Sequence, residues 1–103
     1  MQTNHYRQGD VLIERVESLP KTAKLQKGPV ILSHGEVTGH AHQIHKGANL
    51  YMDPESQATY VEIAEAIADL THEEHATVPL EKGIYRVVRQ REYSPEAIRN
   101  VAD

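Results

Sequence analysis

The chain has 103 residues, of which 39% are hydrophobic and none is Trp, Phe or Cys, so one small core of mainly Val, Ile, Leu and Ala is expected. A net charge of −4 argues against a dedicated DNA- or RNA-binding protein, and the lack of Cys excludes disulfide scaffolds, thiolate metal sites and cysteine nucleophiles. The polar amino-terminal residues predict that no signal peptide is present, and no apolar run is long enough to span a membrane. We therefore expect one soluble, cytoplasmic domain comprising residues 1–103.

Short intervals between Gly and Pro residues favour a sheet-rich fold. The predicted strands are 10–16, 30–32, 39–45, 50–52, 59–63 and 84–93, and segment 21–27 is predicted to be a polar connection. Segment 60–70 fits a helix as well as a strand pair, because Ile63, Ile67 and Leu70 are spaced four and three apart. Ser94-Pro95-Glu96 predicts a short terminal helix or a frayed tail.

Together these elements predict a mainly β fold, a small single-domain antiparallel β-barrel or sandwich with one or two short helices. An α+β fold is the alternative, since the period of segment 60–70 does not decide between helix and strand. A thin core without Phe or Trp also makes a homo-oligomer plausible, because small domains often bury surface against a partner.

Histidines are the most informative residues of the sequence. Six of the seven lie in two short segments, 33–45 and 72–75, and only His5 lies outside them. On a strand, His40 and His42 would project from one face, and a hairpin of 30–34 with 40–44 would place His34 beside His40. His45 would face away. The candidate metal ligands are therefore His34, His40, His42, His72 and His75.

Nitrogen ligands without a thiolate suit a divalent transition metal, and Zn, Ni, Co, Fe and Mn are all feasible. A three-histidine site leaves coordination positions open, which is typical of catalytic centres. The candidate catalytic carboxylates are Glu74, as a ligand or general base, and Glu36, which is available to orient an imidazole. Glu73 is interpreted as solvated. We expect a small metal-binding protein with a histidine-rich pocket. A more specific hypothesis is that it is a metal-dependent enzyme acting on a small molecule.

Two other classes of function stay open. The protein can be a non-catalytic module that binds an anionic ligand or a protein partner, or a structural homo-oligomer whose histidines bridge subunits. Arg86, Arg89 and Arg91 suit bidentate contact with phosphate or carboxylate. The favoured interpretation of these arginines is instead a charged edge strand that prevents aggregation.

Residues 35–42 (GEVTGHAH) resemble the first metal motif of cupins, in which a Gly precedes a His-x-His pair within a β-barrel. The resemblance covers these eight residues only. Positions 44–47 (IHKG) lack the Glu that cupins place after the pair, and no Pro-x-Gly followed by a His occurs. The resemblance implies that a β-barrel with inward-facing histidines is a workable arrangement.

Overall fold

The computed structural model describes residues 4–34 and 40–89, which form eight strands. They are β1 (His5–Gln8), β2 (Val11–Val16), β3 (Lys24–Gln26), β4 (Val30–His34), β5 (Ala41–Ile44), β6 (Ala48–Met52), β7 (Thr59–Thr71) and β8 (Val78–Arg89). The mainly β prediction is confirmed. The described ranges hold no helix at all, and so none that is long and apolar enough to cross a membrane. The expected helix at 94–96 lies outside these ranges.

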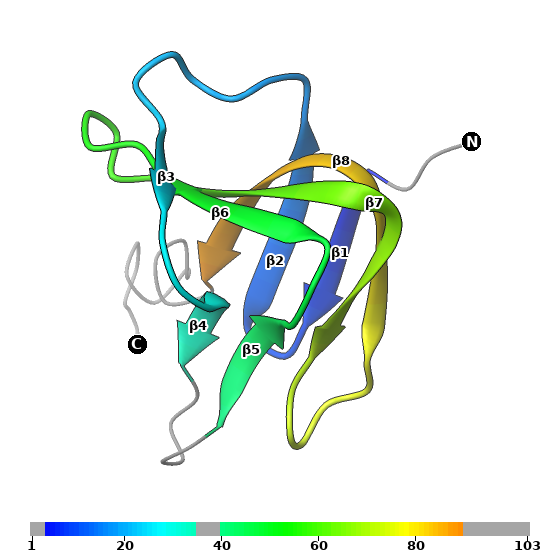
Figure 1. The fold of residues 1–103 in the computed structure, drawn as a ribbon. Helices are drawn as coiled ribbons and strands as arrows, with labels where there is room; N and C mark the ends of the chain where they lie inside the picture. The colour runs from blue at the N-terminus through cyan, green and yellow to red at the C-terminus, as the bar shows by residue number, and fades with distance from the viewer. Residues whose placement is uncertain (1–3, 35–39, 90–103) are drawn as a thin grey trace.

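All strand pairs are antiparallel and belong to one sheet with the order β1-β2-β8-β7-β5-β4 (Figure 1). Strand β7 has two neighbours on one side, because 59–63 pair with β6 while Leu70 and Thr71 pair with β5. Strand β6 also pairs with β3. The sheet is not closed into a barrel, since β1 and β4 end this order. The long β7–β8 hairpin curves so that its two halves belong to different parts of the sheet (Figure 1).

Segment 60–70 is part of strand β7, so the helical interpretation and the α+β alternative are wrong for this segment. The register of β7 against β8 shifts between Ile63 and Ile67, which marks a β-bulge. Ile63 is buried, whereas Ile67 is 55% exposed. A bulge inserts extra residues on one strand and bends it. The buried residues of β7 are accordingly Val61, Ile63, Ala68 and Leu70, so the period of two is interrupted between Ile63 and Ala68.

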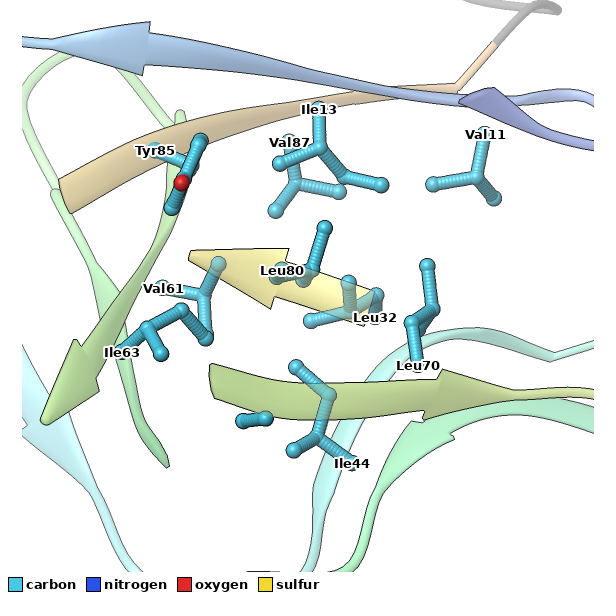
Figure 2. Close-up of a cluster of buried hydrophobic side chains, with 11 residues drawn as sticks. Val11, Ile13, Leu32, Ile44, Val61, Ile63, Leu70, Leu80, Tyr85 and Val87 are labelled. Atoms are coloured by element: carbon cyan, nitrogen blue, oxygen red, sulfur yellow. The ribbon is translucent and has the colours of Figure 1, made fainter. Parts of the chain in front are cut away.

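Buried side chains from β2, β4, β5, β7 and β8 point toward one another and form the core (Figure 2). They are mainly aliphatic, as the composition predicts, and full burial of one such side chain contributes about 1.5–3 kcal/mol. The largest fully buried members are Tyr85, Ile13, Ile44, Ile63, Leu70, Leu80, Val11 and Val61.

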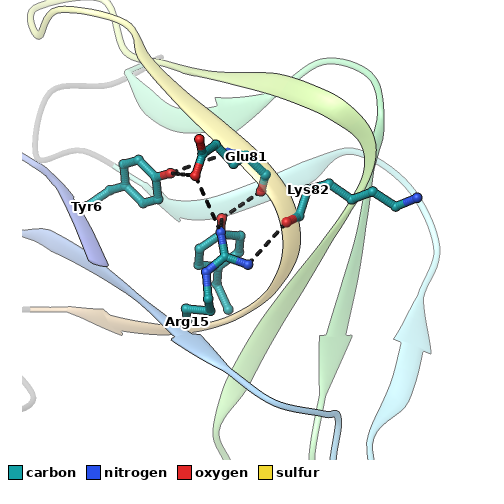
Figure 3. A network of polar contacts seen from close by, with 5 residues as sticks. Tyr6, Arg15, Glu81 and Lys82 are labelled. Atoms are coloured by element: carbon teal, nitrogen blue, oxygen red, sulfur yellow. Dashed lines mark hydrogen bonds and ion pairs between the residues drawn. The ribbon is translucent and has the colours of Figure 1, made fainter. Parts of the chain in front are cut away.

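The hydroxyl of Tyr85 is a polar group at the margin of this core, and a network of polar contacts surrounds it (Figure 3). It donates to the backbone oxygen of Glu81 at 2.6 Å and accepts from Arg15 Nη2 at 2.8 Å. Arg15 Nη1 donates to the backbone oxygen of Lys82 at 3.1 Å. Burial raises the pKa of Tyr85 far above its ordinary value, so the hydroxyl stays protonated. These contacts tie the bend of β8 to β2.

The sequence analysis missed strands β1 and β3, whose residues are mostly polar and exposed. It also assigned β8 to a sheet edge, and this assignment is wrong. Strand β8 pairs with β2 on one side and with β7 on the other. Arg86 and Arg89 therefore do not protect a free edge, and their presence needs another explanation; Arg91 lies outside the described residues.

Candidate functional site

Four histidines from two distant parts of the chain gather into what we call the histidine cluster: His40, His42, His72 and His75. His40 immediately precedes β5 and His42 lies within it, while His72 and His75 belong to the connection between β7 and β8. The ring centres of His42 and His72 are 4.4 Å apart, and those of His72 and His75 are 4.7 Å apart. The ring of His40 lies 5.7 Å from that of His72. The two histidine segments of the sequence thus meet in space.

A buried glutamine determines which nitrogen of His42 carries a proton. Gln8 is 2% exposed, and its Nε2 donates to the backbone oxygens of Leu70 and Ala76, each at 2.9 Å. Its Oε1 is therefore the atom that faces His42 Nδ1, at 2.8 Å. Because an amide oxygen only accepts, Nδ1 of His42 must donate, and Nε2 keeps its lone pair. This assignment follows from the hydrogen-bond network.

The lone-pair nitrogen of His42 lies beside a carboxylate of the β1–β2 turn. Nε2 lies 3.5 Å from Asp10 Oδ1, in the turn between β1 and β2. Burial lowers the pKa of His42, and the neighbouring His72 and His75 act in the same direction, whereas Asp10 acts against them. His42 is therefore neutral near pH 7. A neutral imidazole whose second nitrogen is held by an acceptor is the state that metal ligation requires.

His40 presents a nitrogen without a hydrogen-bond partner. Its Nδ1 is buried, and among the described residues it is the one buried side-chain nitrogen or oxygen left unsatisfied. The nearest charged group is the Glu74 carboxylate, whose Oε2 lies 3.6 Å away. Buried polar groups nearly always have a partner, so an exception calls for an explanation, such as a bound ion or a water molecule.

Glu73 brings a carboxylate into this region. Its Oε1 accepts a hydrogen bond from the backbone N–H of Ala41 at 3.0 Å, which links the β7–β8 connection to the start of β5. This bond lowers the pKa of Glu73. One ligand atom each from His40, His72 and Glu73 all lie within 4.8 Å of one another. Glu73 is exposed, as its interpretation as a solvated residue implies, and it also makes this contact with the backbone.

His72 and His75 are both constrained by their neighbours. His72 Nδ1 accepts from the backbone N–H of Glu74 at 3.0 Å, so the neutral ring carries its proton on Nε2. Ligation through Nε2 would require that proton to move and this contact to break. A Cβ at Gly9 would lie 2.7 Å from His75 Nε2, and Gly9 has φ of +60°. The turn between β1 and β2 therefore depends on glycine both for its conformation and for the approach of His75.

One predicted ligand, His34, is not in the histidine cluster. His34 is exposed and pairs with Ala41, whereas His42 pairs with Ser33. Opposed residues share a face and successive residues alternate, so His34 lies on the face opposite to His42. The predicted hairpin does place His34 next to His40 in the register, since His34 pairs with Ala41, but on the face opposite to His42. Glu36 lies outside the described residues. His45 is exposed and stays outside the cluster, as expected.

Gln8 and Asp10 are site residues that the sequence analysis missed. A signal for them exists: Gly9-Asp10 is a two-residue connection between Gln8 and Val11, and Gly at the first position is typical of a type II′ hairpin turn. Recognition of that turn would have predicted strand β1 and placed Gln8 at its end. The burial of Gln8 against His42 depends on packing and could not have been inferred from the turn.

Comparison with known proteins adds a family but no described function. No curated protein and no solved structure matches the chain significantly. A family described as a domain of unknown function (DUF8820) matches residues 7–90, which include all four histidines of the cluster together with Gln8, Asp10 and Glu73. The match spans most of the chain and nearly all of the eight-stranded sheet. The chain belongs to this DUF8820 family.

Proposed function

We propose that the protein binds a divalent transition metal ion in the histidine cluster. The observation that carries the proposal is the convergence of ligand atoms from His40, His72 and Glu73 within 4.8 Å, together with the unsatisfied Nδ1 of His40. Imidazole and carboxylate ligands without a thiolate suit Zn, Ni, Co, Fe or Mn.

His42 supports the same proposal from a second direction. Its Nδ1–H is held by Gln8, and the centre of its ring lies 4.4 Å from that of His72. An ion held at about 2.0–2.1 Å by two imidazoles would place their ring centres roughly 4.5–5.5 Å apart. The observed separations of 4.4–5.8 Å bracket this range, so convergence needs only small movements of the rings. We assign His42 as a further nitrogen ligand.

The adjacent carboxylates are proposed to have different roles. His40, His42, His72 and Glu73 would fill four coordination positions, and an ion that takes a fifth or sixth ligand would keep positions for water or a small molecule. Such an ion would supply Lewis acidity or a metal-bound water. Glu73 is bonded to the backbone beside His40 and is assigned as the ligand. Glu74 is largely exposed and lies 3.6 Å from His40 Nδ1. It is assigned as the group that accepts a proton, should the centre act on a small molecule.

The test is metal binding by untagged, metal-free protein. Calorimetric titration with ZnCl₂ and elemental analysis should show one ion per chain for the parent protein. The double variant His40→Ala, His72→Ala should lose this stoichiometric binding, while His5→Ala, outside the cluster, should keep it. Equal Zn content in the double variant and the parent would overturn the proposal, provided circular dichroism shows both to be folded.

The neighbouring glutamates provide a matched pair for the ligand assignment. Glu73→Gln should weaken Zn binding by about tenfold or more, since the loss of one charged ligand is worth at least ~1.4 kcal/mol. Glu74→Gln changes the same charge one residue away and should leave the affinity nearly unchanged. The reverse order of effects would transfer the ligand role from Glu73 to Glu74.

A further inference from the structure

A second candidate site lies apart from the histidine cluster, where β7 begins and β8 ends. A cavity of about 250 Å³ is lined there by Ser56, Gln57, Ala58, Thr59, Arg86, Val87 and Arg89. Among the described residues, two guanidinium groups line it and no carboxylate does, in a chain whose net charge is −4. A concentration of positive charge against the balance of the whole protein favours an anionic ligand.

The arginines of this cavity are not accounted for by a sheet edge, since β8 pairs on both sides. Arg86 forms an ion pair with Glu14 at 3.5 Å, but the two side chains are 49% and 45% exposed. Exposed pairs of this kind contribute little to stability, so Arg86 can exchange Glu14 for a ligand at small cost. Arg89 is half-buried beside the buried Val87, which limits how far its side chain can move away from the cavity.

The wall opposite the arginines is held by hydrogen bonds. Asp53 accepts from the Thr22 hydroxyl, from the Ser56 hydroxyl at 2.8 Å and from the backbone N–H of Glu55 at 3.2 Å. These donors occupy the Asp53 carboxylate, which is itself not part of the lining. Gln57, which does line the cavity, has φ of +62°, a conformation that residues other than glycine seldom adopt. Strained residues of this kind cluster at binding sites.

We propose that the cavity between the 56–59 segment and the arginines of β8 binds a phosphate group, either as the free ion or as a small phosphate monoester. Guanidinium groups match the oxygen geometry of phosphate and bind it in a bidentate manner. The volume is below the range of about 300–1,000 Å³ that is typical of drug-sized ligands, which favours a small anion over a larger organic molecule. The hydroxyl of Thr59 adds a neutral hydrogen-bonding group to the lining.

The experiment titrates metal-free protein with inorganic phosphate and, separately, with glycerol 3-phosphate at constant ionic strength. Amide chemical shifts are followed by nuclear magnetic resonance. We expect saturable shifts centred on 56–59 and on the end of β8. Tighter binding of glycerol 3-phosphate would identify a monoester as the ligand, and tighter binding of inorganic phosphate would identify the free ion. Shifts that rise linearly without saturation for both probes would overturn the proposal.

Variants separate this site from general charge effects and from the metal proposal. Arg86→Gln and Arg89→Gln should each weaken phosphate binding by about tenfold, the equivalent of one charge-assisted contact. Arg7→Gln removes the same charge from β1, outside the lining, and should leave binding within about twofold, as expected of an exposed charge. His72→Ala should bind phosphate like the parent. Equal losses in Arg7→Gln and both cavity variants would overturn the proposal, and a loss confined to His72→Ala would place the anion at the histidine cluster instead.

Discussion

Replacing Gln8 by leucine tests the structural basis of the histidine cluster. The amide of Gln8 makes two buried hydrogen bonds, to His42 Nδ1 and to the backbone oxygen of Leu70, and a partly buried one to the backbone oxygen of Ala76. Leucine fills much of the same space but has no polar atom. The Gln8→Leu variant therefore leaves one donor and two acceptors unsatisfied in the interior, and it frees His42 to adopt either tautomer.

The expected loss of stability follows from these three groups. A buried polar group without a partner costs about 1–3 kcal/mol, so three groups cost roughly 3–6 kcal/mol after partial relaxation. Burial of the leucine side chain returns about 1.5–2 kcal/mol. The net destabilisation should be about 2–4 kcal/mol, a large part of the total of about 5–15 kcal/mol for a typical domain. In urea this corresponds to a decrease in the unfolding midpoint of about 1–2 M.

Gln8→Glu is the control that separates stability from metal binding. The carboxylate still accepts from His42 Nδ1–H, but it cannot donate to Leu70 or Ala76. We expect Gln8→Glu to be destabilised, yet to keep Zn affinity, whereas Gln8→Leu should lose about 10–100-fold, as is typical when an orienting partner of a ligand histidine is removed. Urea denaturation and calorimetry measure the two quantities. A loss of less than about 0.5 kcal/mol in Gln8→Leu, or equal Zn affinity in both variants, would refute the reasoning.

Three further predictions concern other features of the fold. Hydrogen bonds, first from Thr22 and then from Ser56, lower the pKa of Asp53 below 3.8. The ionised Asp53 therefore stabilises the fold above that pH, and this stabilisation is lost as the pH falls through the lowered pKa. In denaturation experiments between pH 3 and pH 6, the free energy of unfolding of Asp53→Asn should depend less on pH than that of the parent. Gly9→Ala should destabilise the protein by about 1–2 kcal/mol, because φ of +60° is unfavourable for alanine and its Cβ would clash with His75. Thermal melting measures this loss, and an unchanged melting temperature would contradict the prediction. Protons compete for imidazole ligands, so Zn affinity should decrease steeply below about pH 6, and a flat affinity between pH 7 and pH 5 would exclude imidazole ligation.

Local patterns in the sequence predicted the fold class and several strands. Hydrophobic residues in 10–16, 30–32 and 84–93 have the composition of buried strands, and the structure has β2 and β4 there and β8 over 84–89, while 90–93 lie outside the described residues. These predictions succeed because a strand in the middle of a sheet must bury apolar side chains. Strands β1 and β3 are short and polar, so no comparable signal marks them. Strand β7 was ambiguous because its bulge interrupts the period of two.

The sequence also indicated which histidines belong to the candidate site, but it did not indicate on which face of the sheet each of them lies. Clustering of histidines in two segments singled out His40, His42, His72 and His75, which gather in space. It could not exclude His34, because its face depends on the register of β4 against β5. Register is a property of strand pairing, and a shift of one residue reverses every side chain.

By itself, therefore, the sequence determined a small aliphatic β domain and a set of candidate ligands, because composition and short-range periodicity depend only on neighbouring residues. Only the tertiary structure determined which groups form hydrogen bonds with those ligands or with the backbone beside them. Gln8 bonds to His42, and Glu73 bonds to the backbone beside His40, across separations of 34 and 32 residues. Such contacts arise from the bending and pairing of whole strands, and hydrogen bonds between distant residues leave no periodic trace in the chain.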